Sequence, residues 1–293
     1  MNETIYMPVG EVCSSISDTY REKKNMVTLI NTSDVLEGRV LNHERVPNSN
    51  LKGQFKKTFQ RDDILYSEIR PQNRRFAYVD FSPIDYIAST KLMVIRAKKD
   101  VVSPKYLYYF LKNSSTVAEL QLLAETRSGT FPQITFSEVA NLTIPVPPLA
   151  VQEVIVQTMQ CLEDKTICNE QINDNLQQQA QAIYSSMFID NPDPAWSHGH
   201  LSDLITVKYG KDHKKLADGI YPVYGSGGIM RYVERPLYNK ESVLIPRKGT
   251  LNNVMYVNQP FWSVDTMFYT EMKLPNVAKF VYHFVKAKDL ASM

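Results

Sequence analysis

Cysteine is scarce in this sequence, and it has neither a long apolar run nor the pattern expected of a secretory signal peptide. The three cysteines, Cys13, Cys161 and Cys168, are odd in number and form no CxxC pair, so we expect neither a disulfide framework nor a zinc site. No run approaches the roughly 18 uncharged apolar residues of a membrane helix, and the N-terminus lacks a basic segment followed by an apolar one. The sequence therefore predicts a cytoplasmic protein with no membrane-bound part.

Motifs for catalysis are also missing. There is no GxxxxGK followed by Ser or Thr for a nucleotide motor, no HExxH for a metal and no GxSxG for a nucleophile. The GSGG stretch at 225–228 lacks the spacing of a dinucleotide fingerprint and predicts a flexible turn. The five histidines are scattered along the chain. We therefore expect a non-enzymatic protein with no metal and no cofactor of its own.

Charge is unevenly distributed, although the net charge is only +2. Residues 52–112 hold 13 Lys and Arg against 6 Asp and Glu, and residues 196–293 hold 13 against 8. Residues 149–193 between these blocks hold 1 against 7. A basic block is often an ordinary solvated surface, but two of them on either side of an acidic segment favour a polyanionic partner.

The first 145 residues have the patterns of a mixed α and β domain. LMVIRAKKD (92–100) is rich in apolar and β-branched residues and predicts a strand. PKYLYYFLKNSSTVAELQLLA (104–124) predicts a helix, because Pro104 fits a first turn and apolar residues recur at helical spacing. TFSEVANLTIPVP predicts a short capped helix or turn and then a strand that ends in prolines.

A long helix is predicted after Pro148, because no Gly or Pro occurs from Leu149 to Asn191. A helix of about 40 residues would span roughly 60 Å, far more than an average globular helix. Residues seven apart predict a coiled-coil seam with one polar interruption: Ile155, Leu162, Asn169, Leu176 and Ile183. A surface helix packed on its own domain is the alternative, but the length favours a two-helix coil. DNPDPAWSHG (190–199) then predicts a linker.

The segment from residue 200 onward repeats the pattern of the first domain. Residues 62–95 align with residues 241–272 with short gaps, since both have an acidic start, a strand, a basic loop and a second strand, and an aromatic helix follows each. The rest of the chain contains no second match to residues 120–189. We therefore expect an α+β chain in which two similar α/β domains, the second incomplete, are joined by a long coiled-coil-forming helix.

Several segments resemble the specificity subunit of type I restriction-modification systems. The first is SGTFPQITFSEVANLTIPVPPLAVQ, in which a Gly129–Thr130 turn is followed by the residues that open the helix: Pro145, Pro147, Pro148, Leu149 and Gln152. The second is LINTSDVLEG (29–38). The third is YPVYGSGGIMRYVE together with VLIPRKGTLNNVMYV. The resemblance covers nearly the whole chain. It implies target-recognition domains at 1–148 and, incomplete, at 200–293, a spacer helix at 149–190 and a linker at 191–199.

The resemblance further implies a non-catalytic subunit that recognises double-stranded DNA, one half-site per domain. In this family two long helices pair as a ruler and dock methyltransferase subunits, which a motor-nuclease subunit joins. S-adenosylmethionine, ATP and magnesium are then expected only on those partners. Lys and Arg would neutralise phosphates, and a few polar side chains would reach base edges. By aligned position and residue type we expect the DNA contacts to come from Arg70, Gln72, Asn73, Arg74, Arg75, Tyr224, Ser226, Arg247, Lys248, Asn252 and Asn253.

Alternatives stay open at this point. The incomplete second domain fits a fragment, the product of a gene rearrangement, or a chain that works as a dimer paired through the seam of its long helix. A stand-alone dimeric DNA-binding regulator would bind specifically without methyltransferase subunits. A coiled-coil scaffold would show no sequence-selective binding at any salt concentration. Neither of these two functions explains why the domain is repeated.

Overall fold

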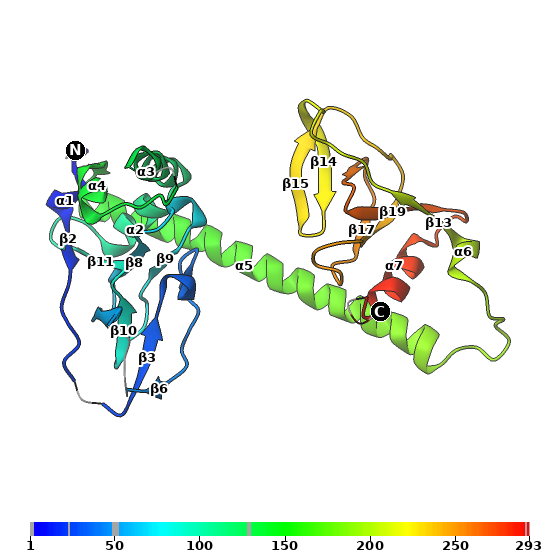
Figure 1. Cartoon of the computed structure of the whole chain (residues 1–293), viewed down its shortest axis with the longest axis horizontal. Helices are drawn as coiled ribbons and strands as arrows, with labels where there is room; N and C mark the ends of the chain where they lie inside the picture. The colour runs from blue at the N-terminus through cyan, green and yellow to red at the C-terminus, as the bar shows by residue number, and fades with distance from the viewer. Residues whose placement is uncertain (1–2, 23, 49–52, 128–129, 291, 293) are drawn as a thin grey trace. The chain divides into compact units, whose positions relative to one another are not determined.

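The structure, a computed structural model, describes residues 3–22, 24–48, 53–127, 130–290 and 292 (Figure 1). Gly129 of the expected turn lies outside these residues. The chain forms two compact units, residues 1–167 (unit 1) and 168–293 (unit 2), so the division falls inside the long helix α5 (Leu149–Ser185). Each unit combines small sheets with short helices. The fold is therefore α+β with a long helix between two sheet-rich domains, which confirms the predicted fold class.

Two four-stranded sheets form the centre of unit 1. The first has the order β2 (Cys13–Ile16), β11 (Leu92–Ala97), β8 (Ile64–Ser67) and β9 (Phe76–Tyr78), all antiparallel. The second has the order β6 (Val46–Pro47), β3 (Met26–Ile30), β10 (Tyr86–Ser89) and β7 (Phe55–Lys57), and only β3 and β10 pair in parallel. Four consecutive residues of β11, Leu92 to Ile95, are fully buried, which explains its continuous apolar sequence.

Shorter pairs and turns complete the strands of unit 1. They are the antiparallel pairs β1 (Ile5–Pro8) with β12 (Thr143–Val146) and β4 (Val35–Leu36) with β5 (Arg39–Val40), and the 3-10 turns η1 (Thr32–Asp34) and η2 (Pro71–Asn73).

Four short helices cover the first sheet of unit 1: α1 (Val9–Val12), α2 (Pro104–Lys112), α3 (Ser114–Arg127) and α4 (Phe136–Asn141). The single helix predicted over 104–124 is wrong, because Asn113 has an extended ψ of 139° and divides it into α2 and α3. The Asn113 side chain accepts a hydrogen bond from the Ser115 amide at 3.0 Å and so begins the second helix. A capping box between Thr135 and Glu138 begins α4.

Helix α5 is fixed at its start by one buried side chain. Gln152 accepts a hydrogen bond from the Ser103 amide at 2.8 Å and donates to the carbonyls of Pro147 at 2.8 Å and Val101 at 3.2 Å. Gln152 is fully buried, so these three bonds replace its contacts with water. The helix ends in one π-helical turn, η3 (Ser186–Asp190), before Pro192 and Pro194. Within the described residues, no helix is both long and apolar enough to cross a lipid bilayer.

Unit 2 repeats the strand order of unit 1. Its antiparallel sheet is β13 (Ile205–Tyr209), β19 (Met267–Met272), β16 (Ser242–Pro246) and β17 (Met255–Val257). A second sheet is β15 (Gly228–Val233), β14 (Asp218–Gly225) and β18 (Trp262–Ser263), with β14 and β18 in parallel. The helices are α6 (Leu201–Leu204), before β13 as α1 is before β2, and α7 (Ala278–Lys286), after β19 as α2 is after β11.

Candidate nucleic-acid interface

The predicted DNA-contacting residues lie in two pairs of neighbouring loops. In unit 1 they belong to the β8–β9 loop (68–75), which lies against the β3 loop (31–38). In unit 2 they belong to the β16–β17 loop (247–254), to the β14–β15 turn (225–228) and, for Tyr224, to the end of β14; the Asn253 side chain joins the loop to the turn. Each pair combines loops from the two sheets of its unit. The β8–β9 and β16–β17 loops connect strands of the first sheet, and the β3 loop and the β14–β15 turn follow strands of the second sheet.

Arginine side chains join the two loops of unit 1. Arg75 is half-buried and donates a hydrogen bond to the Ser33 carbonyl at 2.9 Å. Arg74 is also half-buried, and its Nε lies 3.3 Å from a carboxylate oxygen of Glu37. The backbone reinforces this contact, since the Glu37 amide donates to the Arg74 carbonyl at 3.0 Å. These two cations therefore hold the β3 loop and the β8–β9 loop together.

The outer part of the β8–β9 loop is exposed. Arg70, Gln72 and Asn73 are exposed, while their backbone is fixed: the Arg70 amide donates to the Pro132 carbonyl and the Gln72 amide to the Gln121 side chain on α3, each at 3.1 Å. Arg70 has a left-handed backbone, with φ 44°, which turns the chain sharply at Pro71. A rigid backbone that carries exposed polar side chains suits the recognition of a second surface.

In unit 2 an asparagine makes the matching contact. The half-buried Asn253 side chain donates to the carbonyl of Ser226 in the β14–β15 turn at 2.8 Å. Gly249 allows this approach, because a Cβ there would lie 2.5 Å from the Ser226 hydroxyl and its φ is +84°. The strand register makes Asn253 the equivalent of Arg75, since each lies two residues before the residue that pairs with a buried leucine: Ala77 pairs with Leu65 and Met255 with Leu244.

The remaining predicted residues of unit 2 surround this contact. Arg247 and Lys248 are exposed, and the Arg247 guanidinium lies 5.6 Å from the centre of the Tyr209 ring. Asn252 donates to the Asp289 carboxylate at 2.9 Å. The Tyr224 hydroxyl lies 3.4 Å from the amide nitrogen of Gln259. The β14–β15 turn thus brings Ser226 to the β16–β17 loop, although at least 20 residues separate them in the sequence, whereas Tyr224 contacts Gln259 beyond β17.

Sequence reasoning missed several residues of these loops. Ser33, Glu37 and Gly249 were not singled out, although the segments that contain them, LINTSDVLEG and VLIPRKGTLNNVMYV, carry the family resemblance. Tyr209 was missed because it lies on another strand. Comparison with Ser226, which was predicted, points to Ser33: Ser226 follows β14 and Ser33 follows β3, and each of these strands pairs in parallel with another strand of its sheet.

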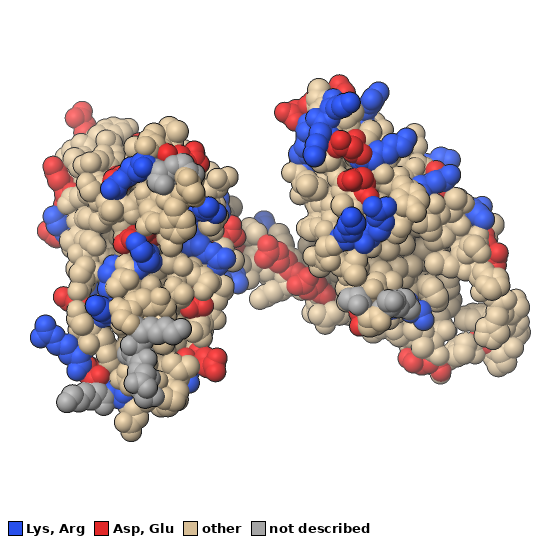
Figure 2. Space-filling view, viewed as in Figure 1, with Lys and Arg blue, Asp and Glu red and all other residues tan. Residues whose placement is uncertain are grey.

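The chemistry of the loops is that of hydrogen-bond donors and cations. Lys and Arg side chains are spread over the visible faces of both units, whereas Asp and Glu line the visible middle of α5 (Figure 2). Beneath the β8–β9 loop, burial raises the pKa of the Tyr66 hydroxyl, so this group stays protonated as it packs on Phe76. The described part of the chain contains no group of three or more His, Cys, Asp or Glu that could hold a metal ion.

Helix α5 packs on unit 1 through a stripe next to the predicted seam. Gln152 and Val156 are buried, and Glu163 and Ile167 are half-buried. Glu163 accepts from the Tyr109 hydroxyl at 2.8 Å and pairs with Lys112. The polar residue of the predicted seam, Asn169, is exposed. The apolar residues of the seam are 37% to 60% exposed: Ile155, Leu162, Leu176 and Ile183.

Comparisons with known proteins agree with this fold. The family model for the type I restriction modification DNA specificity domain matches residues 5–178. The type I restriction enzyme HindI specificity subunit of Haemophilus influenzae is 43% identical over 164 residues, which are 56% of this chain and 36% of that protein. The match thus spans about a third of that relative's length.

Solved structures show the same fold over nearly the whole chain. The alignment with the HsdS subunit from Thermoanaerobacter tengcongensis covers 97% of this chain and 78% of the HsdS chain, with a TM-score of 0.51 and 16% identity. The alignment with the S subunit of a type I restriction-modification system from M. genitalium covers 97% of this chain and 76% of that subunit, with a TM-score of 0.51 and 18% identity. The alignment with a chain from a structure on complex assembly of the type I R-M system covers 99% of this chain and 80% of that chain, with a TM-score of 0.55 and 16% identity.

Proposed function

Since the chain belongs to the type I restriction-modification DNA specificity family, we propose that it is the sequence-specific DNA recognition subunit of a type I restriction-modification complex. One observation carries this proposal: two units with the same strand order each present a pair of joined loops with exposed cations and amides. A repeated binding module suits a DNA site of two half-sites. Units 1 and 2 then act as the two target-recognition domains, each recognising one half-site.

Within each pair of loops the residues have different roles in this proposal. Arg70 and Lys248 are exposed cations and bind phosphate, which contributes affinity without sequence preference. Gln72, Asn73 and Arg247 are exposed and can form paired hydrogen bonds with base edges in the major groove. Arg75 and Asn253 hold the loops in place through their bonds to Ser33 and Ser226.

The long helix serves protein contacts rather than DNA. Residues 149–193 carry 7 Asp and Glu against 1 Lys, a charge that repels DNA phosphates. We assign it as the spacer between half-sites, on which methyltransferase subunits dock and a motor-nuclease subunit joins through them. Its exposed apolar seam also suits pairing with another long helix. The chain itself performs no catalysis, and S-adenosylmethionine, ATP and magnesium belong to those partner subunits.

Binding-site selection tests this function directly. The purified chain, with and without its methyltransferase subunit, is incubated with a randomised duplex library at a fixed moderate salt concentration. A split, asymmetric motif is the expected result and means that both units recognise DNA. A palindromic motif would indicate a dimer that uses one unit only. An enriched motif without any need for the methyltransferase would favour a stand-alone regulator, and no motif under either condition would reject DNA recognition.

Paired variants assign the half-sites. Gln72→Ala is expected to relax the preference at one half-site and Arg247→Ala at the other, because each removes a base contact worth about 1–3 kcal/mol. Lys248→Ala is the matched control in the same loop, since loss of a phosphate contact weakens binding to all sequences alike and lowers the salt slope by about 1. Equal loss at both half-sites from Gln72→Ala would contradict the assignment.

A further inference from the structure

The β3 loop of unit 1 has a glutamate at the tip of a tight hairpin. Strands β4 and β5 pair on either side of Glu37 and Gly38, which form the two-residue turn. Both residues have positive φ, 45° and 103°. Such turns favour Asn, Asp or Gly, because other side chains are strained in the left-handed region. A glutamate at this position therefore points to a role for its side chain.

The hairpin tip is held firmly beside the β8–β9 loop. The Glu37 amide donates to the Arg74 carbonyl at 3.0 Å, and the Gly38 amide donates to the Phe76 carbonyl at 2.9 Å. Gly38 also packs against α2, since a Cβ on it would collide with the Tyr108 hydroxyl. The Glu37 side chain therefore extends from a fixed backbone, which limits the positions that its carboxylate can reach.

The Glu37 carboxylate is exposed and only partly paired. One of its oxygens lies 3.3 Å from Arg74 Nε, and the side chain is 63% exposed. No other residue in the described part of the chain pairs with this carboxylate. A carboxylate has about four acceptor positions, so most of them remain open to a donor outside the chain.

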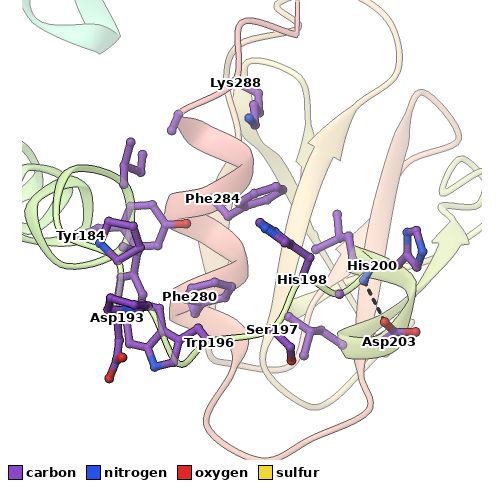
Figure 3. A pocket seen from close by; sticks show the side chains of 18 residues that line it. Tyr184, Asp193, Trp196, Ser197, His198, His200, Asp203, Phe280, Phe284 and Lys288 are labelled. Atoms are coloured by element: carbon purple, nitrogen blue, oxygen red, sulfur yellow. Dashed lines mark hydrogen bonds between the residues drawn. The ribbon is translucent and has the colours of Figure 1, made fainter.

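The other carboxylates of the two loops are already used by the fold. Asp34 accepts a hydrogen bond from the Asn31 amide at 2.8 Å, and a carboxylate oxygen of Glu68 lies 3.3 Å from the Lys91 ammonium. In unit 2, Asp203 beside an apolar groove of about 750 Å³ likewise accepts from a backbone amide at 2.8 Å (Figure 3). The hairpin glutamate thus differs from both of its neighbours, because no backbone amide or lysine occupies it.

A carboxylate on a DNA-facing surface has few favourable contacts. It repels phosphates, and in the major groove it can only accept a hydrogen bond from the amino group of cytosine or adenine. Adenine presents the N7 acceptor beside its amino group, which repels a carboxylate, so N4 of cytosine is the better donor. The DNA-facing loops of unit 2, 225–228 and 247–254, contain no Asp or Glu. We therefore expect such a contact in unit 1 only.

We propose that Glu37 is a specificity-determining residue, which accepts a hydrogen bond from the N4 amino group of a cytosine in the half-site of unit 1. Arg74 is the positioning residue that holds its carboxylate. This role rests on the proposed DNA recognition and goes beyond it by naming one base. The half-site of unit 1 accordingly contains a cytosine whose selection depends on a single side chain.

Binding-site selection with Glu37→Gln tests the base, using the full chain with its methyltransferase subunit. The unchanged chain should enrich cytosine at one position where the variant favours adenine, because a carboxamide pairs with N6 and N7 of adenine. We expect the preference there to change by about tenfold or more and every other position to stay the same. Glu119→Gln, at an exposed glutamate on α3, removes the same charge and should leave the motif unchanged.

A base analogue removes the amino group from the DNA instead. In a duplex with the selected site, 2-pyrimidinone replaces this cytosine and therefore lacks the N4 amino group. The unchanged chain should bind this duplex about tenfold more weakly than the ordinary one, whereas Glu37→Ala should show little difference between the two, since its contact is already lost. Fluorescence anisotropy at one salt concentration measures the four affinities.

The outcomes distinguish this role from the proposed function. An unchanged motif in Glu37→Gln, or an equal loss on the analogue duplex in both proteins, would overturn the role of Glu37 and leave DNA recognition in place. A uniform change in affinity for all sequences would also overturn it, since Glu37 would then only hold Arg74. No enriched motif for the unchanged chain would reject the proposed function and this role with it. Thermal melting checks the fold of both variants, and the unchanged chain on the analogue duplex needs no such check.

Discussion

At the residue scale, one polar contact is made twice by different side chains. Arg75 and Asn253 each donate to a serine carbonyl in the neighbouring loop, at 2.9 and 2.8 Å. A guanidinium and a carboxamide can serve the same purpose because both carry N–H donors on a planar group. The contact fixes the distance between two loops and leaves the side chains of neighbouring residues such as Gln72 and Lys248 exposed.

Gly249 provides a test of this loop contact. Gly249→Ala is expected to lower the free energy of unfolding of unit 2 by more than about 1 kcal/mol, because alanine is strained at φ +84° and its Cβ would displace Ser226. Urea unfolding followed by tryptophan fluorescence measures this, since both tryptophans, Trp196 and Trp262, lie in unit 2. Gly227→Ala is the control, with no atom within 4 Å of its added Cβ, and an equal loss there would contradict the explanation.

Gln152 provides a second test, in unit 1. Gln152→Ala leaves the Ser103 amide and the Val101 and Pro147 carbonyls without their partner in a buried site, so we expect a loss of at least about 2 kcal/mol. Gln157→Ala, at an exposed glutamine one turn later, should change stability by less than about 0.5 kcal/mol. Far-UV circular dichroism during urea unfolding measures both. Equal effects would show that Gln152 does not fix the helix.

At the element scale, α5 has two neighbouring stripes with different neighbours. The stripe of Gln152, Val156, Glu163 and Ile167 packs on unit 1, and the apolar seam one position before it stays largely exposed. A helix places residues four apart on one face, so a shift of one residue turns the stripe by about 100°. The residues at heptad spacing are therefore the ones that stay largely exposed, and their pairing with another helix stays a prediction, whereas the face on unit 1 depends on α2.

The contact between α7 and the second half of α5 is expected to weaken in acid. His283 stacks on Tyr184, and its Nδ1 lies 2.9 Å from the Gln181 side-chain oxygen. Burial and then the charge of Lys286 lower the pKa of His283 from its ordinary value of 6.5. Because the unfolded chain binds this proton more tightly, the stability that neutral His283 contributes is present above pH 6.5 and is lost as the pH falls through the folded pKa.

A variant isolates this effect from other titrating groups. The free energy of unfolding of unit 2 is measured by tryptophan fluorescence at about pH 7.5 and about pH 5.5, on either side of the ordinary histidine pKa. His283→Gln should lose stability at the higher pH and should lose less than the unchanged chain when the pH falls. A variant with the same pH dependence as the unchanged chain would show that His283 is not responsible.

At the scale of the whole molecule, the chain consists of two similar units with separate cores. The largest core of unit 1 contains residues of α1, α2, α4 and β12, and the cores of unit 2 contain residues of β14 to β19 and α7. Each core holds residues of its own unit, so each unit can unfold by itself. Thermal unfolding is therefore expected to show two transitions.

Two equivalent leucines test this separation. Leu65 in β8 and Leu244 in β16 are both fully buried and occupy matching positions in the strand register. Leu244→Ala should lower the midpoint of the transition seen by tryptophan fluorescence, at a cost of about 2–5 kcal/mol, and leave the other transition unchanged. Leu65→Ala should do the reverse, as measured by circular dichroism. If either variant shifts both transitions equally, the chain unfolds as one unit.

Much of this molecule is determined by local sequence. The long helix follows from the absence of Gly and Pro after Pro148, the strands from their apolar runs, and the second domain from the order of segments it shares with the first. These features depend on residues close together in the chain, where backbone preferences and apolar spacing act directly. The family resemblance rests on the same short segments.

Only the tertiary structure decided the division of 104–124 into two helices and the contacts of Arg75 with Ser33 and of Asn253 with Ser226. Each depends on which strands pair, and strand pairing joins residues tens of positions apart whose side chains carry no sequence signal of the partner. Arg75 and Asn253 show this most clearly. Both belong to polar loops that suit DNA contact, but a serine carbonyl of the neighbouring loop, which comes from the other sheet of the unit, lies within 3 Å and accepts their hydrogen bonds.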